Sequence, residues 1–106
     1  MATYSIHYRL DQEKIASTYD QRYRDLQKAI ARVAGDLGTH VDSTSSVWIR
    51  TKEDGESIAK TLKLAVDPRH DVVLVKHAEK AIIFGVGETL NPTQFEIETG
   101  VLLIQV

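Results

Sequence analysis

The chain has 106 residues, of which 42% are hydrophobic and 26% charged, and its 13 basic and 15 acidic side chains give a formal net charge of -2. This size suits one small domain and leaves little volume for a deep catalytic cavity. The lack of cysteine excludes disulfides and thiolate chemistry. Because no apolar run reaches the roughly 20 residues of a membrane span and the first residues lack signal-peptide features, we expect a cytoplasmic protein without a membrane partner.

Charge is unevenly distributed along the chain. Residues 1–77 contain 12 basic and 11 acidic side chains, whereas residues 78–106 contain one basic and four acidic side chains. We expect the acidic last quarter to be a solvated surface segment. The balance of the whole chain does not by itself indicate a nucleic-acid partner.

The first 38 residues predict a strand followed by a helix. Polar and apolar residues alternate over residues 3–10, and this period of two is typical of a half-buried strand. Thr18 and Gln21 have the spacing of a capping box, so a helix is expected to begin there. Gly35 and Gly38 predict its end. The apolar residues of this helix recur at steps of three and four: Tyr23, Leu26, Ile30, Val33 and Leu37.

The next 40 residues predict two short strands, a helix and another strand. The β-branched stretch over residues 40–51 is broken by the polar residues 42–45, which indicates a tight turn or bulge between two strands. Ile58, Leu62 and Ala65 fit a second helix that ends before Pro68. The apolar run over residues 72–75 is typical of a strand that is covered on both faces.

This order of elements predicts an α+β fold of the ferredoxin-like βαββαβ type, with two helices on one face of the sheet. We expect residues 1–77 to form that domain and residues 78–106 to form a C-terminal β extension. The extension contains two strand-length apolar pieces, residues 81–86 and 101–106, separated by a turn at residues 91–92. An unpaired terminal strand promotes aggregation, so the last piece is expected to pair within the chain or across a dimer.

Alternation also predicts which side chains lie on the face of the sheet that the helices leave open. The predicted residues are Ser5, His7, Arg9, Ser46, Trp48 and Arg50. Aromatic and guanidinium groups together are typical of protein interfaces and of surfaces that stack on bases. Since Trp48 is the only aromatic residue in this set, the composition favours a homodimer interface with charges at its rim over direct base recognition.

Catalytic motifs are scarce. The sequence has no nucleophile elbow or phosphate-binding loop. The closest pair of histidines, His70 and His77, flanks a predicted strand, so we predict no metal site from histidine. One carboxylate, Asp11, follows the first strand and could hold a magnesium or manganese ion together with its symmetry mate. The alternative interpretation is that Asp11 only helps the chain to turn.

Three of these segments resemble a known family. Residues 4–10, 43–49 and 71–75 are similar to strands of the small ferredoxin-fold proteins that include the Cas-two family of CRISPR adaptation subunits and the related SinR-like and VapD-like proteins. The resemblance covers about residues 1–77. It implies a homodimer formed through the open face and a C-terminal strand that can cross to the other subunit.

The resemblance does not extend to the nuclease site of that family. In its nuclease members, an aspartate at the end of the first strand of each subunit gathers a metal ion, and here Arg9 stands at the matching position. Two guanidiniums cannot replace two carboxylates around a cation. Asp11 lies two residues further on, about 6.6 Å along a strand. The resemblance therefore implies the fold and the dimer without the catalysis.

We accordingly expect a non-catalytic homodimeric scaffold or interaction protein without a cofactor. The resemblance adds nucleic acid and an integrase-type protein as candidate partners. Candidate phosphate contacts lie on the first helix: Arg22, Arg24, Lys28 and Arg32. Two alternatives stay open. One is a magnesium- or manganese-dependent ribonuclease or deoxyribonuclease that uses Asp11, and the other is a dimeric α+β barrel that binds a small ligand through His7 and His40.

Overall fold

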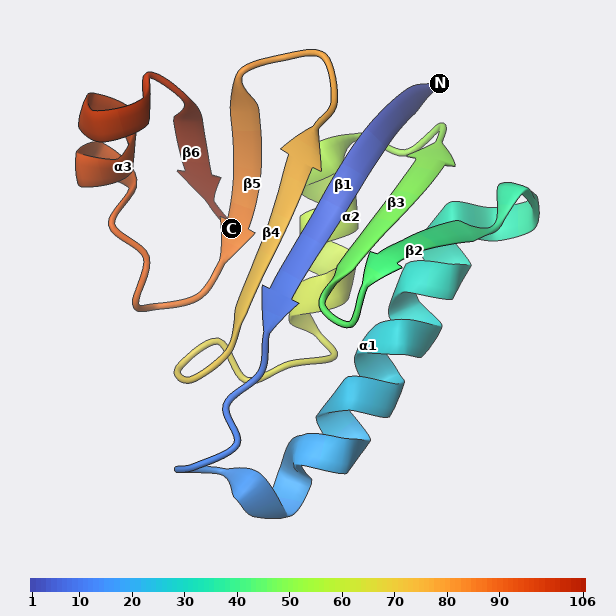
Figure 1. The fold of residues 1–106 in the computed structure, drawn as a ribbon, viewed down its shortest axis with the longest axis vertical. Helices are drawn as coiled ribbons and strands as arrows, with labels where there is room; N and C mark the ends of the chain where they lie inside the picture. Colours follow the sequence, from blue (N-terminus) through green and yellow to red (C-terminus); the bar gives the residue numbers. More distant parts are fainter.

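The computed structural model describes all 106 residues and has an α+β fold with one six-stranded mixed sheet and three α-helices (Figure 1). The strands are β1 (Ala2–Arg9), β2 (Thr39–Ser43), β3 (Ser46–Thr51), β4 (Val72–His77), β5 (Ile82–Val86) and β6 (Leu102–Gln105). The helices are α1 (Tyr19–Ala34), α2 (Gly55–Lys63) and α3 (Pro92–Thr99). The strands lie in the order β2-β3-β1-β4-β5-β6. None of the helices combines the length and apolarity needed to cross a membrane.

The C-terminal segment extends the sheet within the same chain. β5 pairs with β4 in antiparallel fashion, and β6 then pairs with β5 in parallel. All other neighbouring strands are antiparallel. The sheet is thus two strands wider than the four strands formed by residues 1–77, and its last strand has found a partner without crossing to a second subunit.

Helix α3 differs from the turn expected at residues 91–92. The side chain of Asn91 accepts a hydrogen bond from the Gln94 N–H at 3.2 Å, Pro92 occupies the first turn, and Gly100 ends the helix with φ 73°. These are standard signals for the start and end of a helix. The helix has no buried residue, and Ile97 is 74% exposed. The apolar periodicity that predicted the other two helices is absent here, which is why sequence analysis missed it.

The hydrophobic core lies between one face of the sheet and helices α1 and α2, with α2 behind β1 and β4 in Figure 1. The strand residues predicted to face the helices are all buried: Tyr4, Ile6, Tyr8, Val47 and Ile49. The helices contribute a second buried set: Leu26, Ile30 and Val33 from α1, and Ile58 and Leu62 from α2. The predicted inward face of α1 is too long at both ends, because Tyr23 is 37% and Leu37 60% exposed.

Two local expectations need correction. Thr18 does precede α1, but its side chain makes no capping hydrogen bond to the helix and instead donates to the Ile15 carbonyl at 3.2 Å. In β4, Val73 and Val75 are fully buried, whereas Val72 and Leu74 are only half-buried. The apolar run is therefore covered completely on one face only, because α1 and α2 both lie on that side of the sheet.

A buried carboxylate, Asp71, holds three chain segments together just before β4. One oxygen accepts hydrogen bonds from the Arg22 guanidinium at 2.6 Å and from the Asp11 N–H at 2.8 Å. The other oxygen accepts from the Asp67 N–H at 2.8 Å. Asp71 is 1% exposed, so its charge is compensated inside the protein by these donors.

The partner of this carboxylate, Arg22, is equally well satisfied. Its second terminal nitrogen donates to the carbonyls of Asp11 and Ile15, each at 2.8 Å, and its Nε donates to the Thr18 hydroxyl at 2.9 Å. The ion pair thereby fixes the connection between β1 and α1 against the connection between α2 and β4.

We expect Asp71→Ala to lower the free energy of unfolding by about 3–5 kcal/mol, because it leaves the buried Arg22 charge without its partner. Denaturant unfolding followed by circular dichroism measures this loss. Glu56→Ala is the matched control, because it removes the exposed ion pair with Lys60 and should change stability by less than about 1 kcal/mol. Equal effects of the two substitutions would show that the buried pair is not a stabilising centre.

Candidate functional site

The face of the sheet opposite α1 and α2 lacks a helix layer over its first four strands. The molecule measures 37 × 36 × 22 Å, and a view down its shortest axis shows the sheet broadside (Figure 1). Hence the thin dimension holds the sheet and one helix layer only. We call the uncovered surface of strands β2, β3, β1 and β4 the open face. Its side chains are Thr3, Ser5, His7, Arg9, His40, Ser46, Trp48, Arg50, Val72, Leu74 and Lys76.

Beyond β4, the same face of the sheet is covered by an apolar cluster over β5 and β6. A Cβ atom at Gly85 would lie 2.8 Å from the Leu90 side chain, 2.9 Å from that of Leu103 and 3.4 Å from that of Leu74. Ile83 and Leu103 are buried. The segment between β5 and α3 therefore covers this end of the sheet, and glycine at position 85 allows that close approach.

Trp48 lies in the middle of the open face. The register places it between Ser5 on β1 and His40 on β2. Its side chain is 38% exposed, although the neighbouring Ser5 is buried. An indole that remains accessible at the centre of a sheet is a candidate anchor for a protein contact.

The two arginines of the open face lie toward its ends. Arg9 pairs with Val72 at one end of β1, and Arg50 pairs with Thr3 near the other. Six residues along an antiparallel strand separate Thr3 from Arg9, which corresponds to about 20 Å. Both guanidiniums are exposed and neither forms an ion pair. The centre of the open face therefore carries Trp48, small polar groups and one cation, Lys76, which pairs with Ser5 in the same row as Trp48, while the two guanidiniums lie at the ends.

His7 is the histidine of the open face that lies on its central strand β1. Its Nε2 lies 2.8 Å from the Ser5 hydroxyl, and it pairs across the strands with Ser46, whose buried hydroxyl has no hydrogen-bond partner. Partial burial is the main cause that lowers the pKa of His7 below its ordinary value of 6.5. The Lys76 ammonium lowers this pKa further, while Asp42 opposes the shift. Neutral imidazole is thus the favoured form in the folded chain.

Protonation of His7 should destabilise the fold. Because its folded pKa lies below the unfolded value of 6.5, its contribution to stability is present above that pH and is lost as the pH falls through the folded pKa. We expect His7→Gln to flatten the loss of stability on the acid side of pH 6.5. Denaturant unfolding of both proteins across this range tests the sign, and His40→Gln, on the exposed edge strand, is the control. If the free energy of unfolding of His7→Gln fell below pH 6.5 as steeply as that of the wild type, the role assigned to His7 would be contradicted.

The predicted carboxylate site at Asp11 serves a local structural role. Its Oδ2 accepts hydrogen bonds from the N–H groups of Ile15 at 2.9 Å and Lys14 at 2.8 Å, and these bonds lower its pKa. This geometry is that of a turn-forming aspartate. No group of three or more histidine, aspartate or glutamate side chains is arranged to hold a metal ion. Asp11 does line a hollow of about 410 Å³ together with Glu13 and His70.

The four basic residues predicted on the first helix separate into two groups. Arg22 is 7% exposed and its donors are bound within the chain, so it is not available to a phosphate, contrary to the sequence-based expectation. The helical pattern could not reveal its buried partner, which lies 49 residues further along the chain. Arg24, Lys28 and Arg32 are exposed, form no ion pair and follow one another at four-residue steps. They form one basic stripe along α1.

The structure does not bring the two histidines of the ligand-binding alternative into one hollow. His40 lines a shallow hollow of about 230 Å³ that Trp48 and Arg50 also line. His7 is not among its lining residues and lies on the central strand instead.

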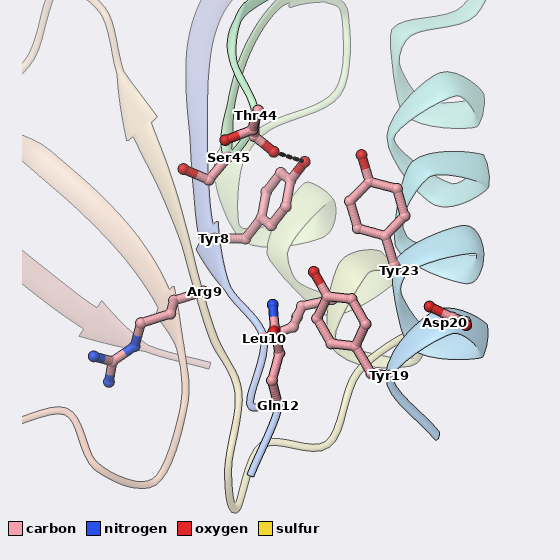
Figure 2. A pocket seen from close by; sticks show the side chains of 9 residues that line it. All are labelled: Tyr8, Arg9, Leu10, Gln12, Tyr19, Asp20, Tyr23, Thr44 and Ser45. Carbon is pink, nitrogen blue, oxygen red and sulfur yellow. Dashed lines mark hydrogen bonds between the residues drawn. The ribbon is translucent and has the colours of Figure 1, made fainter. Parts of the chain in front are cut away.

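A larger hollow, which sequence analysis missed, lies between the end of β1, the turn from β2 to β3 and the beginning of α1 (Figure 2). Its volume is about 650 Å³. The lining residues are Tyr8, Arg9, Leu10, Gln12, Tyr19, Asp20, Tyr23, Thr44 and Ser45. The available signal was the four-residue spacing of Tyr19 and Tyr23 on a predicted helix, which alone does not show that Tyr8 meets them.

No family model, curated protein or solved structure matches the chain. The likeness to small ferredoxin-fold proteins therefore stays an expectation from the sequence, and function has to be argued from the surfaces described above.

Proposed function

We propose that the protein is a non-catalytic homodimeric scaffold in which the open face packs against the open face of a second copy. The observation that carries this proposal is the accessible indole of Trp48 at the centre of a sheet surface without a helix layer. Aromatic anchors at the centre of a contact are a common source of binding energy in protein interfaces.

The fold assignment within this proposal is a ferredoxin-like domain over residues 1–77. It is supported by the chain order β1-α1-β2-β3-α2-β4 and by the neighbouring positions of β2, β3, β1 and β4 in the sheet. On this interpretation, β5, α3 and β6 are an extension added at the edge of β4.

The distribution of polar groups supports a second copy as the occupant of the open face. Interfaces commonly have an apolar centre and a charged rim. Trp48 and the apolar Leu74 belong to the central strands, while Arg9 and Arg50 lie about 20 Å apart along them. Two copies related by a two-fold axis could bury the indoles and leave the guanidiniums in water. Lys76 lies in the same row as Trp48, so its long side chain has to reach water at the edge of the contact to avoid the cost of burying unpaired charge.

Trp48→Glu should weaken the dimer at least about tenfold, because it replaces an apolar anchor and puts two carboxylates near the symmetry axis. Sedimentation velocity measures this: wild type is expected at twice 11.9 kDa at micromolar concentration, and the variant is expected to shift toward monomer. Leu64→Glu is the control, because Leu64 is 89% exposed and lies just after α2, away from the open face.

The single tryptophan provides an independent readout. On dilution of the wild-type protein, its emission should shift to longer wavelength as the indole becomes exposed to water. A wild-type monomer at micromolar concentration, or an emission maximum that does not depend on concentration, would contradict the proposed dimer.

A second function, binding of duplex nucleic acid by the scaffold, is favoured by the basic stripe on α1. Arg24, Lys28 and Arg32 are unpaired cations, and α1 covers the face of the sheet opposite the proposed dimer contact. Both surfaces could therefore be used at once. The neighbouring Asp25 is held by a hydrogen bond from Gln21, so it is not paired with the stripe.

Binding through this stripe should be strongly salt-dependent, with a slope in log affinity against log salt of about -2.7 when one chain makes three phosphate contacts and about -5.4 when both chains of a dimer do so. A gel shift with duplex DNA should show at least about tenfold weaker binding for Arg24→Glu combined with Lys28→Glu. Lys63→Glu combined with Lys80→Glu makes the same change in net charge elsewhere and is the control. Equal weakening by both double variants would show that only net charge matters.

A further inference from the structure

The hollow beside the beginning of α1 presents three tyrosine rings at its wall (Figure 2). We propose that it binds a small organic cation of the methylated ammonium class. This site shares only Arg9 with the open face and no residue with the basic stripe, so the inference does not depend on the proposed dimer.

The rings form a corner of two aromatic walls. Tyr19 and Tyr23 lie one turn apart on α1, with centroids 6.3 Å apart and planes at 26°. Tyr8 approaches Tyr23 from β1 with a centroid distance of 6.4 Å and an angle of 64°. A rounded cation in this corner would contact more than one ring within the roughly 6 Å over which a cation and an aromatic ring attract each other.

The walls of the corner are fixed before any ligand arrives. The Tyr8 hydroxyl donates to the Thr44 carbonyl at 3.0 Å and accepts from the Gln27 amide at 2.8 Å. The ring of Tyr19 lies 6.0 Å from the guanidinium carbon of Arg22, which the ion pair with Asp71 holds in place. Preorganisation of this kind reduces the entropy that binding costs.

The charge and size of the hollow suit a small cation. Asp20 lies at the rim, is exposed and forms no ion pair, whereas the side chain of Arg9 extends away from the rings (Figure 2). The only unpaired charge close to the tyrosine corner is therefore negative. The volume of about 650 Å³ lies within the usual range of small-molecule sites.

The chemistry of the lining favours a methylated cation over a primary ammonium. A primary ammonium has three N–H donors that need acceptors once they leave water. The Thr44 carbonyl already accepts a hydrogen bond from Tyr8, and apart from Asp20 at the rim the walls supply ring faces and no carboxylate. A quaternary ammonium has no N–H donor to satisfy and gains from the negative faces of the rings.

Choline and its neutral isostere 3,3-dimethyl-1-butanol are the probes, because they share a shape and differ in charge. Titration of the full chain, followed by the ring-proton resonances of the tyrosines, should give at least about tenfold tighter binding for choline. Tyr23→Leu should weaken choline binding at least about tenfold, while Tyr23→Phe, which keeps the ring, should stay within about threefold of wild type. Since Tyr23 is 37% exposed, both variants are expected to fold, and their circular dichroism checks this.

Three results would overturn the proposal. The first is the absence of tyrosine shifts at the highest soluble choline concentration. The second is equal affinity for the neutral isostere, which would make the hollow a general apolar site. The third is unchanged choline affinity in folded Tyr23→Leu, which would place the cation elsewhere.

Discussion

The buried ion pair between Arg22 and Asp71 is the interaction on which the arrangement of the open face and of the tyrosine hollow depends. It joins the first turn of α1 to the segment that leads into β4, and it also holds the backbone of the connection after β1. Because Tyr19 precedes Arg22 on α1 and Tyr8 is near the end of β1, the same contacts set how the tyrosine rings face each other. Arg22, which the sequence suggests as a phosphate contact, therefore stabilises the fold from within.

The placement of the helices determines which surface remains for a partner. α1 and α2 pack on the same face of the sheet, and the short segment before α3 covers only the β5 and β6 end of the other. The exposed part is thus limited to four strands, with Trp48 inside it and arginines at its ends. Cations on α1 are directed away from that surface, so a contact between sheets and a contact with phosphates do not compete for the same residues.

Much of the fold was predictable because each element up to residue 77 has a regular pattern. Alternation along β1 and β3 identified the buried and open faces, and apolar spacing identified α1 and α2. Helix α3 was missed because its residues show no such spacing and its capping signals at Asn91 and Gly100 are brief. Arg22 and the tyrosine hollow were missed for a different reason: Arg22 needs Asp71, 49 residues away, and Tyr8 meets residues of a different element, so no local pattern reveals them.

The sheet order also has a consequence for synthesis of the chain. β1 is made first, yet it lies between β3 and β4 in the sheet, and its pairing with β4 joins residues as far apart as Tyr4 and His77. Such distant pairings slow folding because a long loop has to close before they form. One edge of β1 consequently stays unpaired on the nascent chain until β4 has emerged, whereas its other edge pairs with β3, which is made earlier. By contrast, β5, α3 and β6 follow each other directly and can be added to the edge of a core that has already formed.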